Sequence, residues 1–433
     1  MLNETHDPGL RSWVLSAQQP GTDFPLQNLP YCVFRRSGSQ EAWRGGVAIG
    51  DTILDMAAAY ALGVFSSLAA EAAQTACAST LNGLMALGPS AWSALRLALS
   101  RLLRDGAPEA AQLQACLVAQ VDAEYAVSAG IGDYTDFFTS QHHALNAGRI
   151  FQPQNALLPN FKWLPIGYHG RASTVAISGT AVARPHGQTR APEAAAPRFG
   201  PTQGLDYEVE LGIFVGPGNP QGTSIALDDA EDHAFGLCLL NDWSARDVQA
   251  WESMPLGPFM AKNFLTSVSP WIVTLEALAP FRVPLPREAT DPPALPYLQS
   301  QQVQAFDIQL EAWLTPQGEV HATRLSHTSY RHAYWSVAHM LAQHTSNGCA
   351  LLPGDLLGTG TQSGPQPGEE GCLLELTRGG QNLLTLPSGV QRGYLQDGDS
   401  VLLRGVCERA GFARIGFGEC HGQIVPARPA IYL

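Results

Sequence analysis

Residues 206–219, DYEVELGIFVGPGN, are the stretch from which the fold prediction starts. The apolar residues between Glu208 and Val215 predict a strand, and the Gly-Pro-Gly-Asn run that follows predicts a turn. Residues i and i+2 project from the same face of a strand, so Glu208 and Glu210 are expected to share one face. Two neighbouring carboxylates destabilise each other unless one is protonated or a cation lies between them. This pattern predicts either a metal site or an edge strand with solvated acids.

Two further acids stand in apolar or aromatic surroundings. Asp136 lies in DYTDFF, and Asp242 ends the apolar run LCLLND, where a strand is expected to emerge. Carboxylate oxygens are the ligands that Mg²⁺ and Ca²⁺ prefer. The spacing alone does not decide between such a site and ordinary solvated acids.

The rest of the chain is also predicted to be rich in strands. Its 43 Gly and 31 Pro are scattered over 433 residues, which favours many turns. A change of texture near residue 128 predicts a boundary between an N-terminal domain, 1–128, and a C-terminal domain, 129–433. Helical spacing of Ala and Leu predicts helices in the stretch 57–123, including one at 108–121, and a further helix at 330–343. Strands are expected at 31–35, 46–49, 52–54, 174–178, 208–215, 308–314, 373–376 and 400–405.

Composition excludes several classes of protein. The formal net charge of −13 and the lack of a basic run argue against a nucleic-acid partner. The chain has no run of eighteen apolar residues, so we expect no membrane span. The first residues lack a basic segment followed by an apolar one, so we expect no signal peptide. The eight cysteines form no C-x-x-C pair. We therefore expect a soluble cytoplasmic protein with reduced thiols.

Several motifs, in order along the chain, resemble the fumarylacetoacetase family. They include TDFPLQNLPYCVF, GVAIGDTILDM, DYTDFFTSQHHALNAG, PIGYHGRAS, DYEVELGIFVGPGN, NDWSARDVQAWE, PLGPFMAKNF, NGCALLPGDLLGTGTQSG and RIGFGEC. The resemblance runs from about residue 22 to about residue 426. It implies a mainly β (α+β) fold with a small N-terminal SH3-like barrel and a large C-terminal mixed β-roll, assembled as a homodimer. It also implies hydrolysis of a carbon–carbon bond in a 1,3-dicarbonyl substrate, the last step of phenylalanine and tyrosine catabolism.

The resemblance also implies roles for individual residues. The metal ligands are Asp136, Glu208, Glu210 and Asp242, with a second, magnesium position at Thr266 and at Lys262, which would contribute its carbonyl because an ammonium cannot ligate a cation. Ca²⁺ and Mg²⁺ are the expected ions, and Mn²⁺ is a third candidate. His143 is the expected base that activates water, and Glu375 is its partner. Charge stabilisation is assigned to Arg246, Gln249 and Lys262, and substrate contacts to Gln249, Tyr168 and Thr361.

Taken singly, these residues also have ordinary interpretations. Only the register of the motif selects His143 over the adjacent His142. Glu375 alternates with Leu374 and Leu376, as a solvent-facing acid on a strand would, and Lys262 would ordinarily be a surface lysine.

Three positions depart from the family pattern at the substrate pocket. Phe138 and Ser253 stand where the family has tyrosines, and Gln152 stands where it has an arginine. Losing a charge-assisted contact costs about 1.5–3 kcal/mol, or roughly 10- to 100-fold in binding. The sequence therefore favours a substrate less anionic than fumarylacetoacetate, such as a 1,3-diketone. The alternatives are an authentic fumarylacetoacetase, a related metal-enolate reaction (decarboxylation, tautomerisation or carbon–carbon bond formation), and a metal-bearing scaffold without activity.

Overall fold

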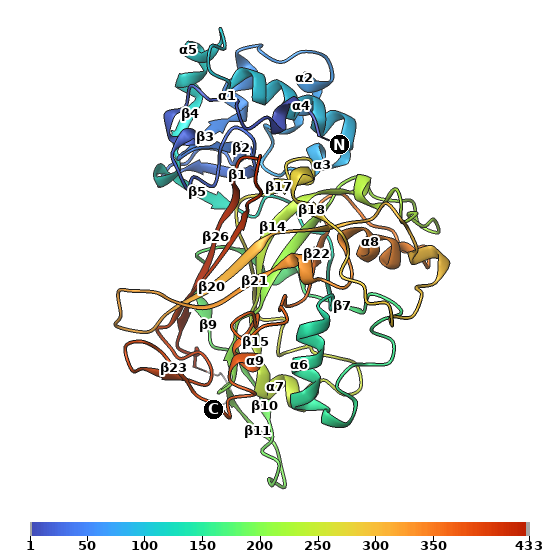
Figure 1. The fold of residues 1–433 in the computed structure, drawn as a ribbon. Helices are drawn as coiled ribbons and strands as arrows, with labels where there is room; N and C mark the ends of the chain where they lie inside the picture. Colours follow the sequence, from blue (N-terminus) through green and yellow to red (C-terminus); the bar gives the residue numbers. More distant parts are fainter. Residues whose placement is uncertain (1, 430–433) are drawn as a thin grey trace.

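The computed structural model describes residues 2–429, and the fold is a mainly β, α+β arrangement with a smaller N-terminal unit above a larger one (Figure 1). The smaller unit contains a five-stranded antiparallel sheet in the order β4-β3-β2-β1-β5. The strands are β1 (Tyr31–Arg36), β2 (Arg44–Ile49), β3 (Thr52–Asp55), β4 (Leu117–Ala119) and β5 (Ala123–Ala126). The connection from β3 to β4 carries helices α1 (Met56–Ala61), α2 (Ser67–Thr75), α3 (Asn82–Ala86), α4 (Pro89–Leu102) and α5 (Ala110–Leu113).

The prediction of one helix at 108–121 is wrong. Only α5 and a short 3-10 turn, Gln114–Cys116, are helical there. Residues 117–119 instead extend the sheet, with Thr52 opposite Ala119. Pairing with the free edge of β3 outweighs the helical spacing of the apolar residues in this stretch.

The larger unit is built on an eight-stranded mixed sheet, whose main path is β7-β6-β22-β13-β14-β16-β8, with β17 paired to β14. Strand β13 confirms the strand expected at 208–215. It lies between β22 and β14, so the alternative of a solvated edge strand is wrong. The bounds are β6 (Tyr134–Phe137), β7 (Gly167–His169), β8 (Val175–Ile177), β13 (Val209–Val215), β14 (Ala234–Asp242), β16 (Thr266–Val268), β17 (Val273–Thr274) and β22 (Leu356–Gly358).

A second, five-stranded sheet packs against the first. Its order is β21-β20-β25-β26-β9, and β25 and β26 contact β14. Alternate residues of β13, from Val209 to Val215, join the core between the two sheets, while Phe214 faces the N-terminal unit. The bounds are β9 (Val182–Ala183), β20 (Gln309–Thr315), β21 (Thr323–Ser329), β25 (Ser400–Cys407) and β26 (Ile415–Val425).

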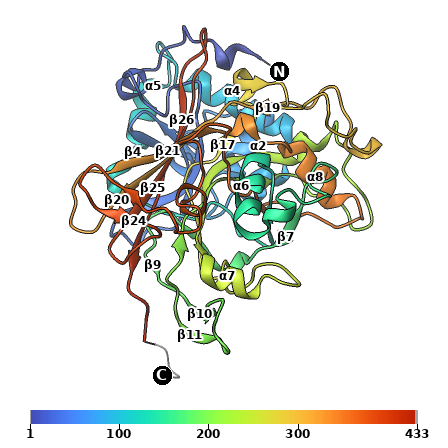
Figure 2. The same cartoon turned by 60° about the horizontal axis from the view of Figure 1, so that its bottom comes forward.

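Helices cover the remaining side of the larger unit, where α6 (Gln141–Phe151) and α8 (Val337–Thr345) lie (Figure 2). The helix expected at 330–343 begins later, because Ser336 accepts a hydrogen bond from the His339 N–H and caps α8. A hairpin of β10 (His186–Thr189) and β11 (Arg198–Pro201) extends away from the body next to α7 (Arg246–Glu252) in both cartoon views. The remaining paired strands are β12 (Leu205–Asp206) with β15 (Ser244–Ala245), β18 (Arg282–Val283) with β19 (Ala305–Phe306), and β23 (Leu384–Thr385) with β24 (Gln391–Arg392).

The prediction of a strand at 373–376 is wrong, because these residues form the short helix α9 (Leu373–Leu376). The backbone N–H groups of Leu373 and Leu374 donate to the carboxylate of Asp206, which satisfies the first turn of the helix. A distant side chain therefore decides this local structure, which the alternation of Leu and Glu does not reveal.

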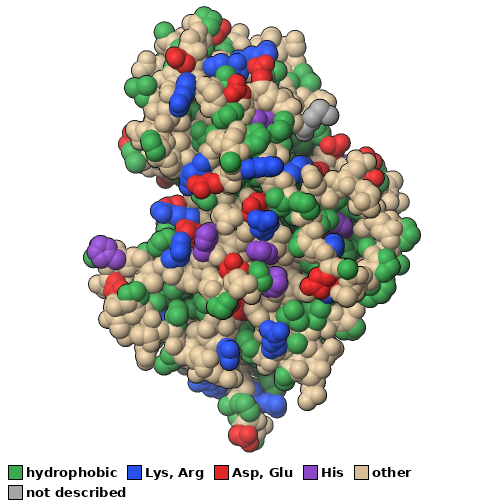
Figure 3. Space-filling view, in the orientation of Figure 1, with side chains coloured by type: hydrophobic (Ala, Val, Ile, Leu, Met, Phe, Trp, Pro, Cys, Tyr) green, Lys and Arg blue, Asp and Glu red, His purple; other side chains and the backbone are tan. Residues whose placement is uncertain are grey.

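Among residues 2–429, no helix is both long and apolar enough to cross a membrane. On the face shown in Figure 3, acidic and basic side chains are interspersed.

Candidate active site

Three strands of the large sheet, β6, β13 and β14, bring four carboxylates together. Asp136 comes from β6, Glu208 directly precedes β13, Glu210 lies within it, and Asp242 ends β14. All four are buried, and ligand oxygens from them lie within 4.8 Å of one another. Gly358 on β22 leaves the necessary space, because a Cβ there would lie 2.6 Å from Asp136 Oδ1.

Burial and mutual repulsion disfavour the charged form of most of these acids. Burial, and then the charge of Asp242, raise the pKa of Asp136 to about 8. Burial and the charge of Asp136 raise the pKa of Glu210 well above its ordinary value. Glu208 differs: burial opposes ionisation, but the charges of Lys262 and Arg246 outweigh it and hold its pKa below the usual range.

Two buried cations compensate part of this charge. The Lys262 ammonium donates to Glu208 and, over 3.0 Å, to Asp242 Oδ2. Arg246 Nη1 lies 2.7 Å from Glu208 Oε1. Thr266 also contributes, since its hydroxyl donates to Asp242 Oδ1 over 2.8 Å. The structure thus brings the Lys262 ammonium to the carboxylate cluster.

The cluster fits a divalent cation. Glu210 Oε2 accepts the Gly360 N–H over 2.9 Å, but Glu210 Oε1 is buried and has no hydrogen-bond partner within residues 2–429. A buried carboxylate oxygen without a partner is costly, and an oxygen-only donor set is the one that hard cations prefer.

A histidine–carboxylate pair lies beside the cluster. His143, on α6, lies 2.6 Å through Nδ1 from Glu375 Oε1 on α9. Asn146 and Ser363 each donate to the same carboxylate over 2.8 Å. Burial opposes ionisation of Glu375, but His143 and these hydrogen bonds lower its pKa. His142 points elsewhere, with its ring 5.9 Å from that of His332.

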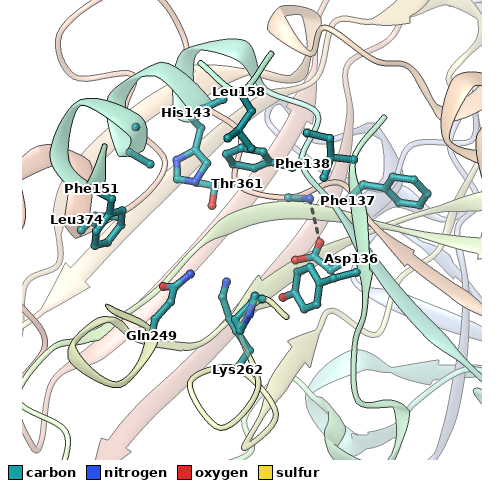
Figure 4. A pocket seen from close by; sticks show the side chains of 18 of the residues that line it. Asp136, Phe137, Phe138, His143, Phe151, Leu158, Gln249, Lys262, Thr361 and Leu374 are labelled. Atoms are coloured by element: carbon teal, nitrogen blue, oxygen red, sulfur yellow. Dashed lines mark hydrogen bonds between the residues drawn. The ribbon is translucent and has the colours of Figure 1, made fainter. Parts of the chain in front are cut away.

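One cavity of about 520 Å³ is lined by His143 and, from the carboxylate cluster, by Asp136 and Glu208. Figure 4 shows His143 and Thr361 on one side of it, and Gln249 and Lys262 on the other. Arg246 and Gln249 share a face of α7, where Arg246 Nη1 donates to Gln249 Oε1 over 3.1 Å. Tyr168 reaches the cavity from β7, and its hydroxyl donates to Asp242 Oδ2 over 3.2 Å.

Comparison with known families decides the relationship. Residues 27–127 match the family described as "Fumarylacetoacetase N-terminal", and residues 134–425 match "Fumarylacetoacetate (FAA) hydrolase C-terminal". The chain belongs to the fumarylacetoacetase family. Members of this family are hydrolases that act on carbon–carbon bonds in ketonic substances.

Curated fumarylacetoacetases are similar over nearly their whole length. The protein from Oryza sativa subsp. japonica is 45% identical, covering 97% of this chain and 98% of its own. Those from Caenorhabditis elegans and Homo sapiens are 48% and 44% identical, each covering 94% of this chain and 97% of its own. A solved fumarylacetoacetate hydrolase from Exiguobacterium antarcticum is 18% identical with a TM-score of 0.50, over 92% of this chain and all of its own, and shows a shared fold.

In this fumarylacetoacetase family member, the three departures from the family pattern lie in different places. Phe138 lines the cavity, with its ring edge-on to that of His143 at 5.4 Å. Gln152 lines the cavity and is exposed at its mouth. Ser253 is not brought to the cavity, because its hydroxyl donates to the Gln249 carbonyl over 2.6 Å within the α7 turn.

The sequence interpretation missed Asp206. This buried acid accepts the Arg246 Nε–H over 2.9 Å and also accepts the N–H groups that begin α9. It stands two residues before Glu208, so the same alternation that pairs Glu208 with Glu210 was the available signal.

Proposed function

We propose that this family member hydrolyses a carbon–carbon bond of a 1,3-dicarbonyl substrate in the cavity between His143 and the carboxylate cluster. One observation carries the proposal: His143, which is hydrogen-bonded to Glu375, lines the same cavity as Asp136 and Glu208 of the cluster and the two buried cations. The names of the curated relatives support the same reaction class.

Asp136, Glu208, Glu210 and Asp242 would hold the cation, which we propose to be Ca²⁺ or Mg²⁺, with Mn²⁺ as a third candidate. When bound, such an ion polarises a substrate carbonyl and stabilises the negative charge that develops during cleavage. A second, magnesium position at Thr266 and the Lys262 carbonyl also remains part of the proposal.

His143 is suited to activate water. If its Nδ1–H donates to Glu375, Nε2 is free to accept a proton from water that attacks the carbonyl carbon. The bond between that carbon and the neighbouring α-carbon then breaks. Its electron pair leaves with the α-carbon as an enolate, which takes up a proton to give the second product.

Donors on the opposite side of the cavity stabilise the developing charge. Arg246 Nη2 is buried and has no hydrogen-bond partner within the described chain, so it is available to an oxyanion. The Gln249 side chain uses its oxygen to accept from Arg246, which leaves its NH₂ group for the substrate. Thr361 Oγ1 is likewise buried without a partner, and Tyr168 is held by Asp242.

From the family resemblance we further propose a cytoplasmic homodimer whose N-terminal domain ends near residue 128, with the site in residues 129–433. The curated relatives make fumarylacetoacetate the first substrate to test. Decarboxylation, tautomerisation and carbon–carbon bond formation are less well supported, because none of them needs a water-activating pair such as His143 and Glu375.

Turnover in H₂¹⁸O tests the reaction class. The metal-loaded protein is incubated with fumarylacetoacetate, and the products are analysed by mass spectrometry. Hydrolysis gives two acids, with ¹⁸O from water in the new carboxylate of the acyl product and none in the carboxylate of the other half. Release of CO₂ without formation of fumarate, or an isomer of unchanged mass, would overturn the hydrolytic assignment.

A further inference from the structure

We infer that the acyl arm of the substrate, the part that extends away from the carboxylate cluster, is uncharged and apolar. This inference rests on the proposed hydrolysis and names its substrate class: 1,3-dicarbonyl compounds whose acyl group ends in an alkyl, alkenyl or aryl group. The observations that carry it are the charges and the lining of the cavity.

The cavity has two chemically different ends. Asp136, Glu208 and Lys262 lie at one end, and mainly apolar side chains, with the neutral amides of Gln152 and Asn155 near the mouth, form the other. Figure 4 shows Phe138, Phe151 and Leu158 on the His143 side, away from Asp136. The arm of a substrate whose reacting carbonyl lies beside His143 would extend among these apolar side chains.

The mouth of this end is apolar as well as exposed. Phe151 is 44% exposed and Leu256 is 94% exposed, although both line the cavity. Pro255 and Pro258 flank Leu256 in the same wall. An apolar arm would cover these side chains and remove their surface from water, which favours binding. A charged arm would gain little from them.

Among the described residues that line the cavity, no lysine or arginine lies at this end to receive a carboxylate on the arm. The lining has one arginine and one lysine within that part of the chain, Arg246 and Lys262, and both are buried at the other end. Arg246 is paired with Asp206 and Glu208, and Lys262 with Glu208 and Asp242. Moving a carboxylate out of water without a paired cation is costly.

The nearest other cation on α6 faces away. Arg149 donates to Asn146 Oδ1 over 3.3 Å and lines a separate hollow with Glu370 and Arg378. Near the mouth, only the neutral amides of Gln152 and Asn155 are available. An amide can bond to a carbonyl or hydroxyl group, but it cannot replace the charge of a guanidinium.

A matched pair of substrates tests this inference. Fumarylacetoacetate and crotonylacetoacetate share the reacting 1,3-dicarbonyl half, and the second has a methyl group where the first has a terminal carboxylate. We expect kcat/KM of the metal-loaded protein to be at least about 10-fold higher for the crotonyl compound, as a missing charge-assisted contact implies.

Two arginine variants sharpen the test. Gln152→Arg places a cation in the cavity wall and should raise kcat/KM for fumarylacetoacetate by about 10-fold or more, relative to the crotonyl compound. Gln154→Arg is the same change two residues along the chain, at a position that does not line the cavity. It should leave the ratio of kcat/KM for the two substrates within about 2-fold of that of the unmodified protein.

The outcomes separate the inference from the proposed function. If the unmodified protein prefers fumarylacetoacetate, the apolar-arm inference is overturned while hydrolysis stands. If the metal-loaded protein cleaves neither compound, the proposed function fails, and the inference fails with it. The ratio of kcat/KM for the two substrates, measured on the unmodified protein, tests the apolar-arm inference even if a variant does not fold.

Discussion

Asp206 holds Arg246 in place: its Oδ2 accepts the Arg246 Nε–H over 2.9 Å, and both side chains are buried. The same carboxylate accepts the N–H groups of Leu373 and Leu374 at the start of α9, the helix that carries Glu375. A single acid therefore connects a guanidinium on one side of the cavity with the partner of His143 on the other.

Replacing this acid should reduce turnover without weakening metal binding. Asp206→Asn keeps the size of the side chain, but its NH₂ group opposes either Arg246 Nε–H or a backbone N–H. We expect kcat to fall by about 10- to 100-fold, with a smaller change in KM, because a charge-assisted hydrogen bond is lost at a positioning residue. Steady-state kinetics and the pH profile of kcat measure this, with metal affinity as the control. A lower melting temperature with unchanged kcat would show a purely structural role.

The two adjacent histidines should differ sharply in function. His143→Ala removes the proposed base, and Glu375→Gln removes its charged partner while keeping the shape. Each should lower kcat by about 10²- to 10⁴-fold, the usual contribution of a general base. His142→Ala is the matched control: its ring faces His332 instead of the cavity, so kcat should stay within about 3-fold. Equal losses in the His142 and His143 variants would contradict the assignment.

Much of the arrangement follows from the sequence because it depends on strand alternation. The spacing of Glu208 and Glu210 predicts one shared face, and the structure places their carboxylates together with Asp136 and Asp242. The spacing does not predict where the strand lies in its sheet. The two carboxylates lie in the interior of the sheet because β22 and β14 pair with β13 on either side.

A contact between distant residues explains one feature that the sequence interpretation missed. Helix α9 forms where alternation predicts a strand, since Asp206, more than 160 residues earlier in the chain, caps it. This contact has no local signature in the sequence. The position of Ser253 has a local cause instead, because its hydroxyl donates to the carbonyl of Gln249 four residues earlier in the same helical turn.

Metal binding should release protons near neutral pH. Burial and Asp242 raise the pKa of Asp136 to about 8, so this acid of the metal-free cluster retains its proton at pH 7, and burial and Asp136 raise the pKa of Glu210 well above its ordinary value. Cation binding requires the deprotonated carboxylates. Titration calorimetry with Ca²⁺ or Mg²⁺ in two buffers of different ionisation enthalpy should show release of about one proton per ion. Identical heats in both buffers would contradict this expectation.

The same shifts predict how the stability of the metal-free protein depends on pH. A carboxyl group whose pKa is raised on folding stabilises the fold below its unfolded pKa, and this contribution is lost as pH rises through the folded pKa. For Asp136 that window runs from about pH 4 to about pH 8. The melting temperature of chelator-treated protein should therefore fall from pH 6 to pH 8.5, and the gain on adding metal should be larger at pH 8.5. A gain that is the same at both pH values would count against the cluster as the metal site.

Glu210→Gln should separate folding from metal binding. Glu210 Oε2 accepts the Gly360 N–H, while Oε1 is buried without a partner. An uncharged amide of the same size cannot ionise, which removes the cost of burying an acid that would be charged in the unfolded chain. The metal-free protein should therefore melt at a higher temperature at pH 8, by roughly 1 °C for each kcal/mol gained. The same change removes a ligand and should weaken metal affinity about 100-fold or more, with a parallel loss of activity at limiting metal.

Glu193→Gln, an exposed acid in the loop of the β10–β11 hairpin, provides the matched control. It removes one negative charge from the chain without touching the cluster, so both the melting temperature and the metal affinity should stay unchanged. If Glu210→Gln lowers the metal-free melting temperature while metal affinity is kept, Glu210 stabilises the fold through its bond to Gly360. The cation would then be held by the remaining three acids or at another site.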